Sequence, residues 1–158
     1  MGAPITAYNR ISSDVIRVHS NIYDPDFVAV VDETLLHTVD VTAGLKKEGA
    51  IIVNTAKSKE EIMPQLNGYE GRVVTIDART ISEEALGKYF PNSPMLAAVV
   101  ATTGVMPKET FLHEMRASYK HKFAKKTGSD RWKYESTGNG FCGCRGSIEE
   151  IEDENRYQ

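Results

Sequence analysis

Three short apolar runs constrain the fold of this chain more than any other feature of its sequence. They are Phe27–Val31, Ala50–Val53 and Val73–Ile76. Runs of this length without polar alternation are typical of strands buried on both faces. Segments with helical character follow each run, and strands that alternate with short helices form parallel sheets with crossover connections. The sequence therefore predicts an α/β domain whose sheet is mostly parallel.

An N-terminal β-hairpin is expected in front of this sheet. The segments 5–11 and 15–18 are rich in β-branched and aromatic residues, and the Ser12-Ser13-Asp14 sequence between them is typical of a turn.

The second half of the chain predicts two longer helices. Asn92 lies at the start of a small, apolar segment that ends at Gly104, and this helix is expected to be buried. Residues 108–122 have an apolar stripe at four-residue spacing, as in an amphipathic helix. The pattern decays after about residue 126, so we expect an α/β domain over residues 1–126 and an irregular, flexible C-terminal extension over residues 127–158.

Composition narrows the class of protein. A chain of 158 residues suits one domain, and 19 basic against 22 acidic residues leave a net charge of −3. The sequence has no excess of basic residues such as nucleic-acid-binding proteins carry. It also has no apolar run long enough to span a bilayer and no signal-peptide pattern. A cytoplasmic protein that binds neither nucleic acid nor membrane is expected.

Polar residues at the strand ends are the candidate ligand contacts. Asn54 and Thr55 directly follow the second apolar run, and ligands of open α/β sheets collect at the carboxyl ends of the strands. The competing hypothesis, which is the more common case, is that these residues only cap the following helix. No glycine-rich phosphate loop of either common pattern occurs in the chain.

The two cysteines, Cys142 and Cys144, are the only candidates for a metal site. Structural zinc and iron–sulfur sites normally need four ligands, and the four histidines are scattered along the sequence. No metal site within this chain alone is therefore expected, and the cysteine pair is a weak candidate that would need ligands from elsewhere. No catalytic residues are evident.

Several segments resemble the gamma subunit of 2-oxoacid:ferredoxin oxidoreductases, and the pyruvate enzymes (pyruvate synthases) in particular. The resemblance covers roughly residues 2–126 and rests on these strings: Gly-Ala-Pro-Ile-Thr-Ala-Tyr-Asn-Arg-Ile at 2–11, Ile-Arg-Val-His-Ser at 16–20, Asp-Glu-Thr-Leu-Leu at 32–36, Gly-Ala-Ile-Ile-Val-Asn-Thr at 49–55, Pro-Asn-Ser-Pro-Met-Leu at 91–96 and Thr-Gly-Val at 103–105.

The resemblance implies a Rossmann-like α/β unit with helices on both faces of its sheet. It also implies a place in a complex used in anaerobic metabolism. Such complexes decarboxylate pyruvate or a related 2-oxoacid oxidatively, form acyl-CoA and CO2, and reduce ferredoxin. Thiamine diphosphate, Mg²⁺ and iron–sulfur clusters would belong to the alpha, beta and delta subunits, whereas the gamma subunit would serve assembly and the handling of coenzyme A.

Site residues implied by the resemblance follow its motifs. Gly2, Ala3 and Pro4 match the end of an Arg-Gly-Ala-Pro motif and are expected to contact a neighbouring subunit. Asn54, Thr55 and Asn92 are expected to face coenzyme A. Family members normally begin with a strand and a glycine-rich loop that this sequence lacks, so we expect a free sheet edge where that strand would pair. The alternative function is a stand-alone Rossmann-like module that binds CoA or a nucleotide.

Overall fold

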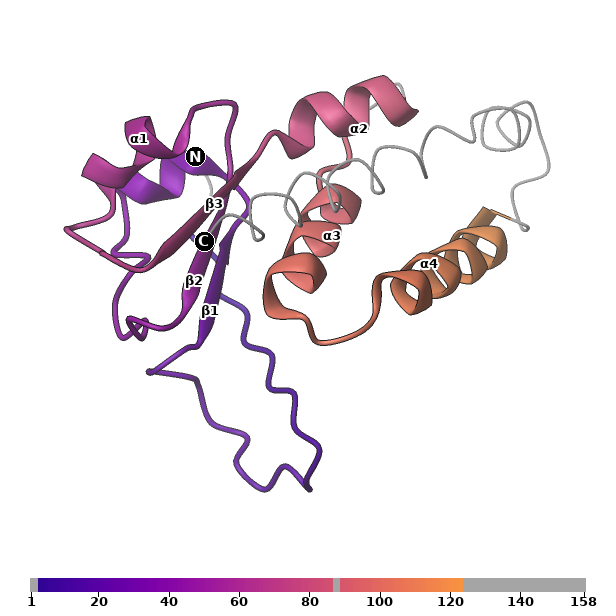
Figure 1. The fold of residues 1–158 in the computed structure, drawn as a ribbon, viewed down its shortest axis with the longest axis horizontal. Helices are drawn as coiled ribbons and strands as arrows, with labels where there is room; N and C mark the ends of the chain where they lie inside the picture. Colours follow the sequence, from indigo (N-terminus) through magenta and orange to yellow (C-terminus); the bar gives the residue numbers. More distant parts are fainter. Residues whose placement is uncertain (1–2, 87–88, 124–158) are drawn as a thin grey trace.

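The computed structural model describes residues 3–86 and 89–123 and shows a parallel three-stranded sheet between layers of helices (Figure 1). The strands are β1 (Phe27–Val30), β2 (Ala50–Asn54) and β3 (Arg72–Ile76), and they lie side by side in chain order. Ala50 is in register with Phe27 of β1 and with Arg72 of β3. The α/β class and the parallel sheet predicted from the apolar runs are confirmed.

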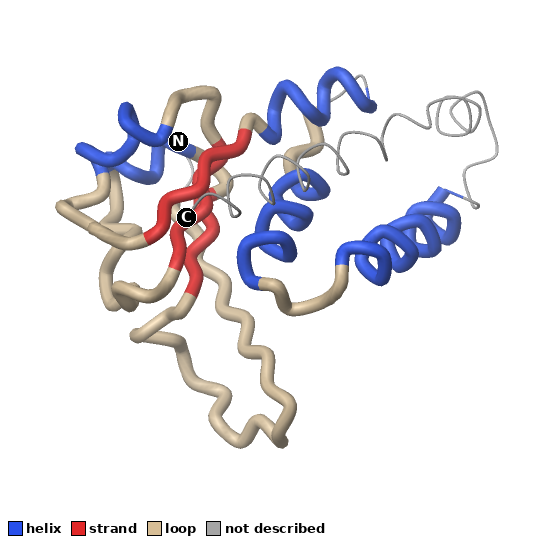
Figure 2. Tube along the Cα trace, in the orientation of Figure 1, coloured by secondary structure: helices blue, strands red, loops and turns tan. Residues whose placement is uncertain are grey.

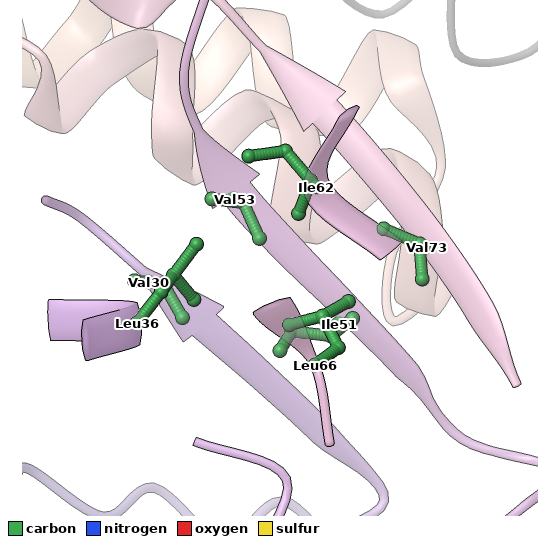
Figure 3. Packing of buried hydrophobic residues seen from close by; sticks show 7 residues of the cluster. All are labelled: Val30, Leu36, Ile51, Val53, Ile62, Leu66 and Val73. Atoms are coloured by element: carbon green, nitrogen blue, oxygen red, sulfur yellow. The ribbon is translucent and has the colours of Figure 1, made fainter. Parts of the chain in front are cut away.

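One face of the sheet is covered by the two crossover connections, as the colouring by secondary structure makes plain (Figure 2). The first contains the 3-10 helix η1 (Glu33–His37), and the second contains α1 (Lys59–Ile62) and the 3-10 helix η2 (Met63–Gln65). Seven buried side chains form the core on this face (Figure 3): Val30, Leu36, Ile51, Val53, Ile62, Leu66 and Val73. They include alternate residues of β2, as the two-residue period of a strand requires.

The opposite face is covered by α3 (Asn92–Thr103), which contacts all three strands. Ile52, Val74 and Ile76 pack there against Met95 and Ala98. The buried helix expected from the sequence is therefore α3. It forms the second helical layer, so that helices cover both faces of the sheet. Gly104 ends α3 in the left-handed conformation at φ +62°, which costs glycine little.

Two further helices flank α3. α2 (Ala78–Leu86) begins directly after β3, and the Asp77 carboxylate accepts a hydrogen bond from the Thr80 N–H in its first turn at 2.9 Å. α4 (Lys108–Phe123) places Phe111 and Leu112 against Ala97 and Val100 of α3. No described helix is both long and apolar enough to cross a membrane.

The prediction for β1 was only partly right. Its continuous apolar run suggested burial on both faces, yet Phe27 and Val31 are 42% and 46% exposed and only Val30 is buried. The reason is position: within the described residues β1 pairs on one side only, with β2, so it is an edge strand.

The predicted N-terminal β-hairpin is wrong as a paired ladder. Residues 3–26, called the arm below, contain no strand, although the arm turns back on itself and projects below the sheet (Figure 1). The expected turn is present, since the Ser12 hydroxyl accepts a hydrogen bond from the Asp14 N–H at 3.0 Å. An isolated two-stranded ribbon gains too little burial to hold a ladder by itself.

Candidate functional site

The candidate site is the carboxyl edge of the sheet, where β1 and β2 end and α2 begins. Residues that follow β1 and β2 meet here because parallel strands end on the same side of a sheet. The main participants are Glu33, Asn54, Thr55 and Lys57.

Asn54 joins three elements through its side-chain amide. Its Nδ2 donates to the Val31 carbonyl oxygen beyond β1 at 2.9 Å, and its Oδ1 accepts from the Ala78 N–H at the start of α2 at 3.0 Å. The residue is only 8% exposed. These two bonds satisfy backbone groups that a parallel sheet leaves open at its end, so Asn54 stabilises this edge whatever else it does.

Thr55 is also buried, and its hydroxyl connects two loops. The hydroxyl donates to the Glu33 carboxylate and accepts from the Lys57 N–H at 3.1 Å, while the Thr55 N–H donates to the Ile76 carbonyl at 2.9 Å. Both predicted strand-end residues thus lie together at this edge, with their polar atoms bonded to the protein.

Glu33 and Lys57 complete the cluster with an ion pair at 3.2 Å between Lys57 Nζ and Glu33 Oε1. The Thr55 hydroxyl, followed by Lys57, lowers the pKa of Glu33 below its ordinary value, so the carboxylate is ionised at neutral pH. Both side chains are about two-fifths exposed, so the pair contributes little to stability by itself.

Asp32 adds a second carboxylate next to this cluster. It caps η1 by accepting from the Thr34 N–H at 2.9 Å and from the Thr34 hydroxyl at 2.8 Å, and these bonds lower its pKa. Two ionised carboxylates against one lysine make the local charge negative.

No hydrogen bond joins the other predicted site residues to this cluster within the described part of the chain. Asn92 is the first residue of α3 and is exposed, and no hydrogen bond of the described residues joins it to Asn54 or Thr55. Ala3 and Pro4 begin the arm and are exposed. Gly2, Cys142 and Cys144 lie outside the described residues. Within the described ranges, no group of three potential metal-ligating side chains occurs.

Sequence reasoning missed Lys57 and its pairing with Glu33. The available signal was an acidic residue shortly after the first apolar run and a basic residue shortly after the second. Charges in these places lie at the same sheet edge and can pair. That inference requires the strand order, which the sequence alone did not supply.

The solved structure of pyruvate oxidoreductase subunit PORC from Thermotoga maritima is similar to this chain, with a TM-score of 0.63 and 27% sequence identity. The match covers 81% of this chain and 64% of that one. This similarity supports the α/β architecture described above.

Curated relatives match at higher identity. The pyruvate/ketoisovalerate oxidoreductases common subunit gamma of Pyrococcus furiosus is 42% identical over 137 residues, which cover 86% of this chain and 74% of the relative. The pyruvate synthase subunit PorC of Methanosarcina barkeri is 41% identical over 116 residues, covering 73% of this chain and 62% of that protein.

The family model described as pyruvate ferredoxin/flavodoxin oxidoreductase matches residues 1–128. That range includes the sheet, every described helix and the arm. The chain therefore belongs to the pyruvate ferredoxin/flavodoxin oxidoreductase family.

Proposed function

We propose that this chain is the gamma-type subunit of a cytoplasmic complex that oxidatively decarboxylates pyruvate or a related 2-oxoacid. The complex would use coenzyme A, produce acyl-CoA and CO2, and reduce ferredoxin. The observation that carries the proposal is the family match over residues 1–128, together with relatives that are themselves subunits of pyruvate oxidoreductases. Alpha, beta and delta subunits are the proposed partners, and they would hold thiamine diphosphate, Mg²⁺ and the iron–sulfur clusters.

The experiment is affinity purification of the tagged chain after co-expression with the proposed alpha, beta and delta subunits. We expect a stable complex that contains thiamine diphosphate and iron, and that reduces ferredoxin when pyruvate and CoA are added. A tagged chain that elutes alone, under conditions where the other subunits are present and folded, would overturn the proposal.

The finer part of the proposal concerns coenzyme A. Asn54 and Thr55, with Asn92 on α3, are proposed to lie near the bound coenzyme, and Lys57 is the cation of this edge that can meet a phosphate. Lys57 Nζ is paired with Glu33 Oε1 at 3.2 Å, so removal of the Glu33 charge would leave the lysine free to pair with a phosphate. Glu33→Gln is expected to lower the KM for CoA several-fold, and Lys57→Met to raise it.

Lys47→Met is the matched control, because Lys47 is 85% exposed and its only described ion pair, with Glu70, is 3.9 Å long. Unchanged KM values for CoA in both Glu33→Gln and Lys57→Met would reject CoA binding at this edge. Assembly of the complex would then be the only role proposed for this chain.

A second candidate function is a stand-alone module that binds CoA or a nucleotide without a redox role. The polar carboxyl edge of a parallel sheet favours it, since this is where such folds hold their ligands. Calorimetric titration of the isolated chain with CoA and with its adenosine fragment distinguishes the two. Heat with the isolated chain and no association with other subunits would favour the module.

A further inference from the structure

The arm exposes apolar side chains that a free domain normally buries. Three lie on the limb before the turn and three on the limb after it: Ile5, Tyr8, Ile11, Val15, Val18 and Tyr23. Four of them are more than 70% exposed. Single apolar side chains on a surface are common, but a run of six over nineteen residues marks an interaction site.

The backbones of the two limbs do not pair with each other. The Arg10 guanidinium donates to the Val18 carbonyl and so connects the two limbs, but no backbone-to-backbone hydrogen bond joins them among the described residues. Extended backbone with open N–H and C=O groups is the part of a protein that pairs with a strand of another chain.

The base of the arm is nevertheless anchored to the body. Lys46 Nζ contacts Asp26 Oδ1 at 2.6 Å, and the Ala50 N–H donates to the Asp26 carbonyl at 3.1 Å. Gly44 passes so close that a Cβ on it would lie 1.9 Å from the Tyr23 carbonyl oxygen. The arm therefore leaves the sheet at a defined point, and a partner bound to its limbs would be held in a defined position.

The chemistry of the arm favours a protein as its partner. A lipid surface cannot satisfy open backbone groups, whereas a strand edge of another polypeptide can. The arm holds two basic residues, Arg10 and Arg17, against three acidic ones, Asp14, Asp24 and Asp26, so its charge of −1 selects no strongly charged partner. A complementary surface combines apolar pockets with a free strand edge.

We propose that the arm is a docking element that lies in an apolar groove on another subunit of the oxidoreductase. Its backbone there pairs with an open strand edge of that subunit. This inference rests on the proposed function, because family membership makes a different subunit, rather than a second copy of this chain, the expected partner. It extends the predicted contact at Gly2, Ala3 and Pro4 to both limbs of the arm.

The experiment compares two variants of the full chain. The arm variant carries both Ile11→Asp and Val15→Asp, and the control variant carries Val39→Asp. Ile11 and Val15 belong to no core cluster, so both variants should fold, which the thermal unfolding of the isolated chains verifies. Val39 is 40% exposed on the body and serves as the control. We expect the arm variant to bind the other subunits at least tenfold more weakly and Val39→Asp to bind like the wild type.

Hydrogen exchange provides an independent readout. Amides of residues 3–23 should exchange rapidly in the isolated chain and become at least tenfold slower in the complex. Wild-type affinity of the arm variant, or arm amides that stay unprotected in the complex, would overturn the docking role. If the isolated wild type is a dimer that the arm variant dissociates, a second copy is the partner and the proposal is wrong.

These outcomes are separable from those of the proposed function. If the wild type and Val39→Asp both fail to bind other subunits, the subunit assignment itself fails. If both bind and the arm variant binds equally well, only the docking role fails.

Discussion

β2 and the first limb of the arm have similar kinds of residues and opposite surroundings. Every residue of β2 (Ala50–Asn54) is buried, with strands on both sides and side chains packed on both faces. Four of the nine residues in the limb from Ala3 to Ile11 are β-branched or aromatic, against three of five in β2, yet every residue of the limb is exposed. The difference teaches that β-forming composition fills a core only where neighbours occupy both edges and both faces of the strand.

β1 lies between these extremes and shows the same rule at the level of single residues. It has β2 on one edge and no described strand on the other, and its exposure falls between that of β2 and that of the arm. Within the described residues the outer edges of both β1 and β3 are unpaired, and the expectation that a further family strand pairs with one of them stays a prediction. The presence of neighbouring strands, rather than the types of residue, accounts for the increase in exposure from β2 through β1 to the arm.

The largest expected effect contrasts truncation in the core with truncation in the arm. Leu66 belongs to the second crossover and is fully buried in the core, so Leu66→Ala should lower the free energy of unfolding by about 3 kcal/mol. Ile11→Ala should change it by less than about 0.5 kcal/mol, because Ile11 is 74% exposed. Urea titration of both variants measures the difference, and equal losses would show that the arm packs on the body in solution.

A smaller effect is expected at the carboxyl edge. Asn54→Ala leaves the Val31 carbonyl and the buried Ala78 N–H without their partners and should cost about 2 kcal/mol. Asn21→Ala is the matched control, since Asn21 is exposed on the arm. The same titration measures both variants. A loss at Asn54 no larger than that at Asn21 would mean that water replaces the two bonds without cost.

The smallest expected effect concerns pH. The pKa of Glu33 in the folded chain is lowered from 4.5, mainly by the Thr55 hydroxyl. A lowered carboxyl pKa stabilises the fold above the pKa of the unfolded state, and this stability is lost as the pH falls through the folded-state value.

Thr55→Val should therefore flatten the fall in stability below about pH 4.5, by well under 1 kcal/mol because Glu33 is two-fifths exposed. Urea midpoints at pH 7 and pH 3.5 for both proteins test this. Asp14→Asn is the control, because it removes a carboxylate from the exposed arm, away from the carboxyl edge of the sheet. Identical acid dependence in the wild type and Thr55→Val would remove Glu33 as its cause.

The sequence by itself determined the class of fold and most of its elements. Alternation of apolar runs with helical segments is local information, and it predicted the parallel sheet, the buried helix from Asn92 and the end of that helix at Gly104. The resemblance of the motifs likewise identified the family, which the match over residues 1–128 confirms. The division at residue 126 and the C-terminal extension stay predictions, since residues 124–158 lie outside the described part.

Tertiary structure alone decided which groups meet. Asn54 bonds to residues 23 and 24 positions away, and the Glu33–Lys57 pair forms only because β1 and β2 are parallel neighbours that end at the same edge. Edge position exposed Phe27 and Val31 although their run predicted burial, and the predicted hairpin became an unpaired arm. A local pattern specifies what a segment tends to form, whereas burial and pairing depend on neighbours distant in the chain or on another chain.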